Sequence, residues 1–218
     1  MRKIAISDIH GHPRTFLALL DQIGLAKEDE LYLLGDFVNK GPDSEGLLDQ
    51  IISLQQQGFQ LAGVRGNHDQ MWLNEYEQGF RYLRESHRKF LEELPLYLHI
   101  SPFWMVHAGF NFMSGDPLND QRAMMSIRNW RNKLNYDWLE KEIILHGHVR
   151  RTRAQIELDV AMEGPVIDID NGCFNVFEAG QGHLCALDLT NFQLWFQENL
   201  DHSARGQLYF PVAFPHQG

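Results

Sequence analysis

Short apolar runs separated by polar clusters recur along the chain, and their lengths are typical of β-strands. Glycine, proline or charged residues bound most of these runs, which favours strands over buried helices. The expected strands cover residues 3–6, 31–34, 60–64, 97–100, 103–106, 142–145, 166–169, 184–189 and 194–196. Because short turns separate the last three runs, we expect these three strands to form an antiparallel meander.

Apolar residues at helical spacing predict helices between several of these strands. Pro13 opens a one-sided helix that ends near Gly24, and a second helix begins near Asp43 or Ser44. Aromatic residues alternate with Glu and Arg over residues 71–94, which indicates a helical, lid-like segment. Residues 110–140 have the composition of a loop and helix segment, and a polar loop is expected after His148.

The order of these elements predicts an α/β fold. Each of the first three strands is followed by a polar cluster and then by a helix, which favours a parallel sheet with right-handed crossovers. In such sheets the functional site lies at the carboxyl ends of the strands, where the polar clusters fall. The chain contains no internal repeat or linker, so we expect residues 1–218 to form a single domain.

The composition and net charge of the chain indicate which classes of binding partner to expect. The chain is 44% hydrophobic and 22% charged, as in soluble globular proteins, and its net charge of -10 disfavours binding to a nucleic-acid polymer. Cys173 and Cys185 are too few for a disulfide framework and are expected to be buried thiols. The apolar stretch after Lys3 stops at Ser7, too early for a signal peptide, and no run is long enough to span a membrane. We therefore expect a cytoplasmic protein without a membrane partner.

Residues 35–42 contain the residue around which we expect the functional site to be built. Asp36 follows an apolar strand, a costly place for a lone carboxylate unless a cation lies beside it. Asp8 and His10 follow the first strand two residues apart, so in an extended chain they would point to the same side. Carboxylate, imidazole and amide groups are suitable transition-metal ligands. The candidate ligands at the strand ends are Asp8, His10, Asp36, Asn67, His107 and His148.

This set suits two divalent metal ions that share Asp36 as a bridging ligand. We expect the first ion to be held by Asp8, His10 and Asp36. The second ion would be held by Asp36, Asn67, His107 and His148. Two aspartates do not neutralise two divalent cations, so the centre would stay electropositive and attract a phosphate ester. A hydroxide bridging the two ions could then attack phosphorus in line.

The combined motifs resemble the calcineurin-like metallophosphoesterases, and are most similar to the bacterial and phage serine/threonine phosphoprotein phosphatases. The resemblance covers roughly residues 4–200. It implies a sandwich of two sheets flanked by helices (αββα). The motifs that carry it are Asp8-Ile9-His10-Gly11, Gly35-Asp36-Phe37-Val38-Asn39-Lys40-Gly41, Gly66-Asn67-His68-Asp69, His107-Ala108-Gly109 and Gly147-His148.

The resemblance also implies roles for residues that are not metal ligands. His68 would be the general acid that protonates the leaving oxygen, and Arg128 would bind the phosphate. The family usually has Asp-Arg where this chain has Asn39-Lys40. We expect Asn39 to offer His68 an amide oxygen without charge, and Lys40 to attract phosphate without the bidentate fork of arginine.

Three functions remain open from the sequence. The first is hydrolysis of phosphomonoesters, with a phosphoprotein or a small phosphate ester as substrate. The second is symmetrical bis(5'-nucleosyl)-tetraphosphatase activity, because the Asn-Lys-Gly-Pro sequence at residues 39–42 resembles the diadenosine tetraphosphatase-like branch. The third is a catalytically silent metal-binding scaffold. Manganese is the expected metal, although iron and zinc accept the same ligands.

Overall fold

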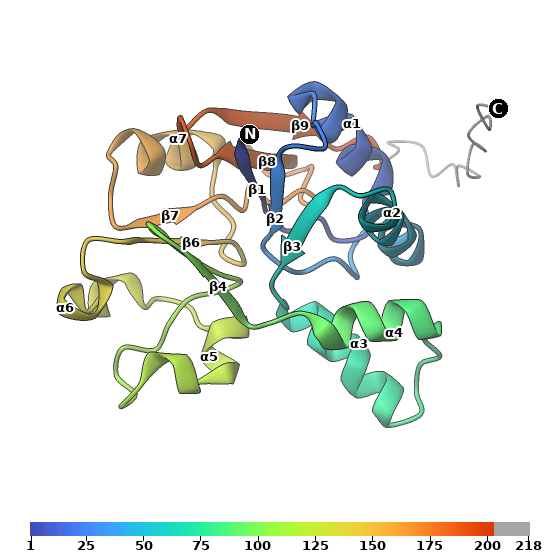
Figure 1. Ribbon diagram of the computed structural model, residues 1–218, viewed down its shortest axis with the longest axis horizontal. Coiled ribbons are helices and arrows are strands. Elements are labelled where there is room, and N and C mark those ends of the chain that lie inside the picture. The colour runs from blue at the N-terminus through green and yellow to red at the C-terminus, as the bar shows by residue number, and fades with distance from the viewer. Residues whose placement is uncertain (203–218) are drawn as a thin grey trace.

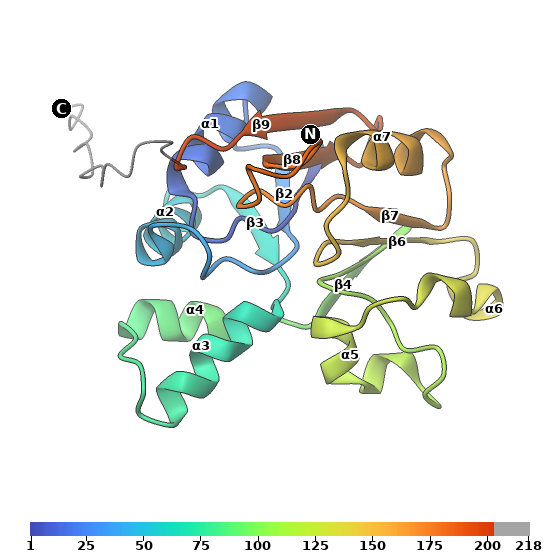
Figure 2. The same cartoon turned by 180° about the vertical axis from the view of Figure 1, so that it is seen from behind.

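The computed structural model describes residues 1–202, which form two mixed β-sheets packed face to face (Figure 1). The first sheet has the strand order β3-β2-β1-β8-β9, and the second has the order β4-β5-β6-β7. Helices cover the outer faces of both sheets, as Figure 2 shows from behind. The predicted α/β two-sheet sandwich flanked by helices is therefore confirmed.

The first sheet contains the parallel strands that the sequence predicts. β1 (Lys3–Ile6), β2 (Glu30–Leu33) and β3 (Gln60–Gly63) pair in parallel, with β1 paired to β2 and β2 to β3. Next to β1, the strands β8 (His183–Asp188) and β9 (Leu194–Glu198) extend the sheet in antiparallel pairing. The carboxyl ends of β1 and β2 therefore lie side by side.

The second sheet corrects the predicted meander. β4 (Tyr97–Ile100) and β5 (Phe103–Val106) form an antiparallel pair, and β6 (Ile143–His146) and β7 (Val166–Asp168) continue in parallel from β5. β7 thus belongs to the second sheet, whereas β8 and β9 belong to the first.

β7 pairs with β6 rather than with β8 because a crossover helix follows β6, where a loop was expected. α7 (Arg153–Ala161) connects β6 to β7, and such a connection makes the two strands parallel. Its start is marked by a capping box, in which Thr152 accepts the N–H of Gln155 and the Gln155 side chain accepts the N–H of Thr152. The buried apolar face of α7 consists only of Ile156 and Val160. Because this face is so narrow, the sequence pattern did not indicate a helix.

Alternation along the central strands builds the hydrophobic core on both sides of the first sheet. Ile4 and Ile6 of β1 face a core shared with the helices, whereas Ala5 faces a second core between the two sheets. On β2, Leu33 faces the core shared with the helices and Tyr32 faces the core between the two sheets. A third core lies between the second sheet and residues 110–139.

The helices beside the first sheet include the helical segment expected for residues 71–94. α1 (Pro13–Ile23) and α2 (Ser44–Gln56) match the predicted helices. The aromatic segment consists of two helices, α3 (Asn67–Glu77) and α4 (Glu85–Glu93), which pack together as a hairpin (Figure 1). α3 also begins four residues earlier than expected, so that the polar cluster after β3 lies on its first turn.

Residues 110–140 contain short helices that cover the second sheet. These are the 3-10 helices η1 (Pro117–Asn119) and η2 (Arg131–Lys133) and the α-helices α5 (Gln121–Ser126) and α6 (Tyr136–Leu139). Both cysteines are buried and free, as predicted. Over residues 1–202, no helix combines the length and the apolar character that crossing a membrane requires.

Candidate metal centre

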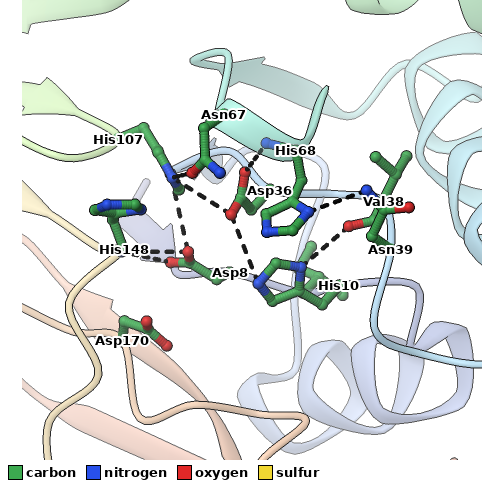
Figure 3. A network of polar contacts seen from close by, with 12 residues as sticks. Asp8, His10, Asp36, Val38, Asn39, Asn67, His68, His107, His148 and Asp170 are labelled. Atoms are coloured by element: carbon green, nitrogen blue, oxygen red, sulfur yellow. Dashed lines mark hydrogen bonds and ion pairs between the residues drawn. The ribbon is translucent and has the colours of Figure 1, made fainter. Parts of the chain in front are cut away.

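The predicted ligands meet where strands of both sheets end, as Figure 3 shows. Asp8 follows β1 and Asp36 follows β2, so the first sheet supplies both carboxylates. Asn67 opens α3 just after β3. His107 and His148 follow β5 and β6 of the second sheet. The site is therefore built at the carboxyl edges of the two sheets together.

Asp36 lies at the centre of this cluster. One carboxylate oxygen is 3.6 Å from Nε2 of His10 and 3.4 Å from Nε2 of His107. The other oxygen accepts the backbone N–H of His68 at 2.9 Å. Burial acts to raise the pKa of Asp36, but the surrounding imidazoles, His107 foremost, hold it below the usual range. Asp36 is thus an anion with histidines on two sides.

Two groups of side chains around Asp36 could each hold a metal ion. Within each group, the donor atoms lie within 4.8 Å of one another. Asn67 adds an amide oxygen 3.1 Å from Nε2 of His107. One group is His10, Asp36 and His68, and the other is Asp36, His107 and His148.

The histidine rings are oriented so that nitrogen lone pairs face the cluster. Nδ1 of His10 lies 3.0 Å from the carbonyl oxygen of Val38, and Nδ1 of His107 lies 2.8 Å from that of Leu34. These contacts of Nδ1 with carbonyl oxygens hold each ring with Nε2 directed at Asp36, where a metal ion would bind in place of a proton. Nε2 of His148 is buried and has no hydrogen-bond partner among the described residues. These donors fit two divalent cations of the transition series.

The two histidines of the second group have pKa values shifted in opposite directions. Burial acts to lower the pKa of His107, but the carboxylates of Asp36 and Asp8 raise it to about 10. Burial lowers the pKa of His148 to about 3, with help from His107 and from Arg128. His148 is therefore a neutral imidazole, as metal coordination requires.

Asp8 differs from the geometry that the sequence suggests. The strand ends at Ile6, and His10 has a φ of 51°, so the chain from Asp8 to His10 is not extended. The carboxylate of Asp8 accepts the Ser7 hydroxyl at 2.6 Å and the N–H of His148 at 3.2 Å. It also lies 3.9 Å from Nδ1 of His107. Asp8 is thereby tied to the second sheet, whereas His10 faces Asp36.

Strained backbone surrounds the cluster. Gly35 has a φ of 91°, and a Cβ at this position would lie 2.7 Å from the backbone nitrogen of Gly66. Left-handed φ values at non-glycine residues cost free energy and are concentrated at functional sites. Site residues with positive φ are His10, Asp36, Asn39, Lys40 and His148.

The contacts of Asn39 correct the expectation that it offers oxygen to His68. The Asn39 oxygen accepts the indole N–H of Trp72 at 2.7 Å, and its amide nitrogen lies 3.0 Å from Nδ1 of His68. Because an indole nitrogen can only donate, the orientation of the amide is fixed. Asn39 therefore donates to Nδ1, and the proton of a neutral His68 is on Nε2, so in this state His68 has no free lone pair for a metal ion. Burial also lowers the pKa of His68, against the opposing effect of Asp36.

Two structural contributors were not among the predicted site residues. Asp69 is fully buried and accepts the backbone N–H groups of Asp36, Phe37 and Gly66, each at 2.9 Å. Burial and the Asp36 carboxylate raise its pKa to about 7. Trp72 orients Asn39 from one helical turn after His68. The i,i+4 spacing of His68 and Trp72 was the available signal, but it required the helix to begin at Asn67.

The predicted phosphate-binding cations lie near different members of the cluster. Arg128 follows α5 and is exposed, and its charge contributes to the lowered pKa of His148. The Lys40 amine lies 5.6 Å from the ring centroid of Phe174, a ring that packs edge-on against His10. Each cation therefore lies near a different candidate metal-binding group, Arg128 near His148 and Lys40 near His10.

Comparison with known proteins matches most of the chain to one family. The calcineurin-like phosphoesterase family matches residues 1–171. A symmetrical bis(5'-nucleosyl)-tetraphosphatase of Nitrosomonas europaea is 50% identical over 70 residues, which cover 32% of this chain but only 25% of that protein.

Solved structures show that the fold is shared more widely. A structure described as a candidate diadenosine tetraphosphatase has a TM-score of 0.72 at 21% identity, covering 92% of this chain and 95% of that chain. A serine/threonine phosphatase of Saccharomyces cerevisiae has a TM-score of 0.66 at 16% identity, covering 94% of this chain and 82% of that chain. At these identities the likeness concerns the fold alone.

Proposed function

Because the chain belongs to the calcineurin-like phosphoesterase family, we propose that this metal-dependent phosphoesterase hydrolyses dinucleoside polyphosphates, with symmetrical cleavage of the tetraphosphate chain. Phosphomonoester hydrolysis, the first expectation from the sequence, becomes the second candidate. The segment of 70 residues that is 50% identical to a symmetrical tetraphosphatase supports this order. The intact donor set and the family argue against a silent scaffold.

The contact between Asn39 and His68 is the observation that carries the proposal. A phosphomonoester with an alkoxide leaving group needs a proton donor, and an imidazolium is suited to that task. Here the Asn39 amide donates to Nδ1 of His68, which disfavours the imidazolium. A nucleotide leaving from a phosphoanhydride is already a stable phosphate anion, so it needs little protonation. The site therefore suits anhydrides better than alkyl esters.

The side chains of this chain then have separate roles. Neutral His68 would donate a hydrogen bond from Nε2 to the leaving oxygen. Lys40 and Arg128 would hold phosphoryl oxygens near different members of the cluster. Asp69 would keep Asp36 and α3 in register through its three backbone contacts. Two divalent cations, held by Asp8, His10, Asp36, Asn67, His107 and His148, would supply Lewis acidity and offset phosphate charge.

A product assay tests this proposal. The purified protein, supplied with Mn²⁺, is incubated with diadenosine tetraphosphate and, separately, with glycerol 2-phosphate, a monoester whose leaving group is an alkoxide. We expect ADP as the nucleotide product and a kcat/KM at least about 100-fold higher for the dinucleotide. Formation of ATP and AMP would contradict symmetrical cleavage. A higher kcat/KM for the monoester would reverse the order of the two candidates.

A further inference from the structure

Two cations share one aromatic ring beside the metal cluster. The Lys40 amine lies 5.6 Å from the ring centroid of Phe174, and the Arg150 guanidinium carbon lies 5.5 Å from it. The same ring contacts His10 edge-on, with a centroid distance of 5.0 Å. Three segments distant in sequence therefore place two positive charges next to one candidate metal ligand.

Neither cation is neutralised by a carboxylate. Over residues 1–202, no ion pair involves Lys40 or Arg150, although other arginines of the same region are paired, Arg151 with Asp159 and Arg153 with Glu157. Because both cations contact the same ring, their charges lie at most about 11 Å apart and repel each other weakly. An anion bound between them would remove that repulsion. In a chain of net charge -10, two cations without a carboxylate partner beside a candidate metal ligand favour the binding of an anion.

The geometry of the loop holds these groups in place. The stem of Arg150 packs over Gly172, where Cγ and Cδ lie 3.2 Å from the position of a Cβ. The N–H of Gly172 donates to Asp170 at 2.7 Å, and its carbonyl accepts the N–H of Asn175, also at 2.7 Å. Phe174 thus lies in a hydrogen-bonded turn, and the cations are positioned before a ligand arrives.

We propose that Lys40, Phe174 and Arg150 form a subsite for the phosphoryl groups that adjoin the group being cleaved. This proposal rests on the proposed function, since it assigns the subsite to the polyphosphate arm of a dinucleotide. Two cations on one ring match two or more consecutive phosphoryl groups, whereas the metal cluster and Arg128 would accommodate a single phosphate. Stacking of a nucleobase on Phe174 is disfavoured, because the two cations already occupy its surroundings.

Substitution of Arg150 tests the subsite through specificity. Arg150→Gln should lower the ratio of kcat/KM for diadenosine tetraphosphate to that for p-nitrophenyl phosphate by about 10- to 100-fold, mainly through KM of the dinucleotide. Phe174→Leu should lower the same ratio about two- to fivefold, because the cations lose their cation–π contacts. Arg150→Lys should restore part of the ratio.

Arg153→Gln is the matched control. Arg153 also lies over an aromatic ring, 4.7 Å from the Phe196 centroid, but within residues 1–202 its ion pair is with Glu157 and its ring contact is with Phe196, not with the cluster. The control should leave the ratio unchanged. An unchanged ratio in Arg150→Gln, with ADP still the product, would overturn the subsite and leave the proposed function intact.

Inhibition of monoester hydrolysis separates the two proposals. With Mn²⁺ in excess, inorganic tripolyphosphate should inhibit p-nitrophenyl phosphate hydrolysis more strongly than orthophosphate does. Arg150→Gln should raise the inhibition constant of tripolyphosphate at least about tenfold and that of orthophosphate less than about twofold. If this difference appears but the dinucleotide is not hydrolysed, the subsite stands and the proposed function fails. Equal changes for both inhibitors would refute the subsite.

Discussion

At the scale of single residues, the orientation of one amide decides which proton His68 carries. Trp72 donates to the oxygen of Asn39, so the amide nitrogen is the group that faces Nδ1 of His68. A carboxylate at the same position could accept from both partners. The difference between asparagine and aspartate is therefore a difference in the charge of the neighbouring imidazole, and it bears directly on the leaving group.

Asn39→Asp should favour protonated His68 and raise kcat/KM for alkyl phosphomonoesters by about tenfold or more, within the range of general acid catalysis. Hydrolysis of diadenosine tetraphosphate should stay flat or fall, because the added anion repels a polyanionic substrate. Steady-state kinetics on both substrates provide the measurement. Without a gain on the monoester, the proton-donor role of His68 would be refuted.

Asp36→Asn should remove both metal equivalents, because Asp36 belongs to both candidate groups. The amide still offers an oxygen to the N–H of His68, so the local fold is retained. Elemental analysis of the purified variant measures the loss. Asp43→Asn, at the exposed N-cap of α2, is the control, since asparagine caps a helix as well as aspartate does. Two equivalents in Asp36→Asn would exclude a shared ligand.

At the scale of elements, the site depends on where strands and helices begin and end. α3 starts at Asn67, so Asn67, His68 and Asp69 have helical geometry on its first turn. Asp69 joins that turn to the loop after β2 through three N–H groups. At the opposite end of the sheet, Asp29 has a comparable role, because it joins the start of β1 to the turn before β2.

The contacts of Asp29 predict that the free energy of unfolding depends on pH. It accepts the backbone N–H and the guanidinium of Arg2 and the N–H of Ala26, and these bonds, that with Arg2 foremost, hold its pKa below the usual range. A depressed pKa in the folded state adds stability above the unfolded-state pKa of about 3.9, and this stability is lost as the pH falls.

Asp29→Asn should therefore cost about 1.5–3 kcal/mol of unfolding free energy at pH 7, and the difference from the unmodified protein should begin to shrink at about pH 4 and shrink further below it. Urea unfolding at a series of pH values measures it. Asp21→Asn, on the exposed side of α1, should show no such dependence. A constant difference across the series would mean that the effect of Asp29 is not that of its charge.

At the scale of the whole molecule, the metal centre joins the two sheets. Asp8 and Asp36 follow strands of the first sheet, whereas His107 and His148 follow strands of the second (Figure 3). Binding of cations to this folded arrangement must stabilise it by mass action. The metal should therefore contribute to the stability of the sandwich as well as to catalysis.

Removal of the metal with a chelator should lower Tm by about 5–10 °C, the value for ligand at about 100 times its Kd and a chain of this length. Re-addition of Mn²⁺ should restore Tm, and Asp36→Asn should have the lower Tm with or without metal. Differential scanning calorimetry is the measurement. A chelator-independent Tm in the unmodified protein would contradict a centre that joins the sheets.

The sequence alone determined most strands and the candidate ligands. Apolar runs such as 97–100 and 103–106 are strands because their periodicity and bounding turns are local properties. The candidate ligands can be predicted for a related reason: a polar residue directly after a buried strand is visible in the sequence. The combined motifs identified the family, which the match over residues 1–171 confirms.

Only the tertiary structure decided the partners of each element and the contacts of each side chain. The separation of β7 from β8 depends on α7, whose apolar face was too narrow to stand out among its polar neighbours. The orientation of Asn39 depends on Trp72, and the subsite at Phe174 depends on cations from two other segments. These contacts join residues far apart in the sequence, and local periodicity carries no information about which distant group a side chain meets.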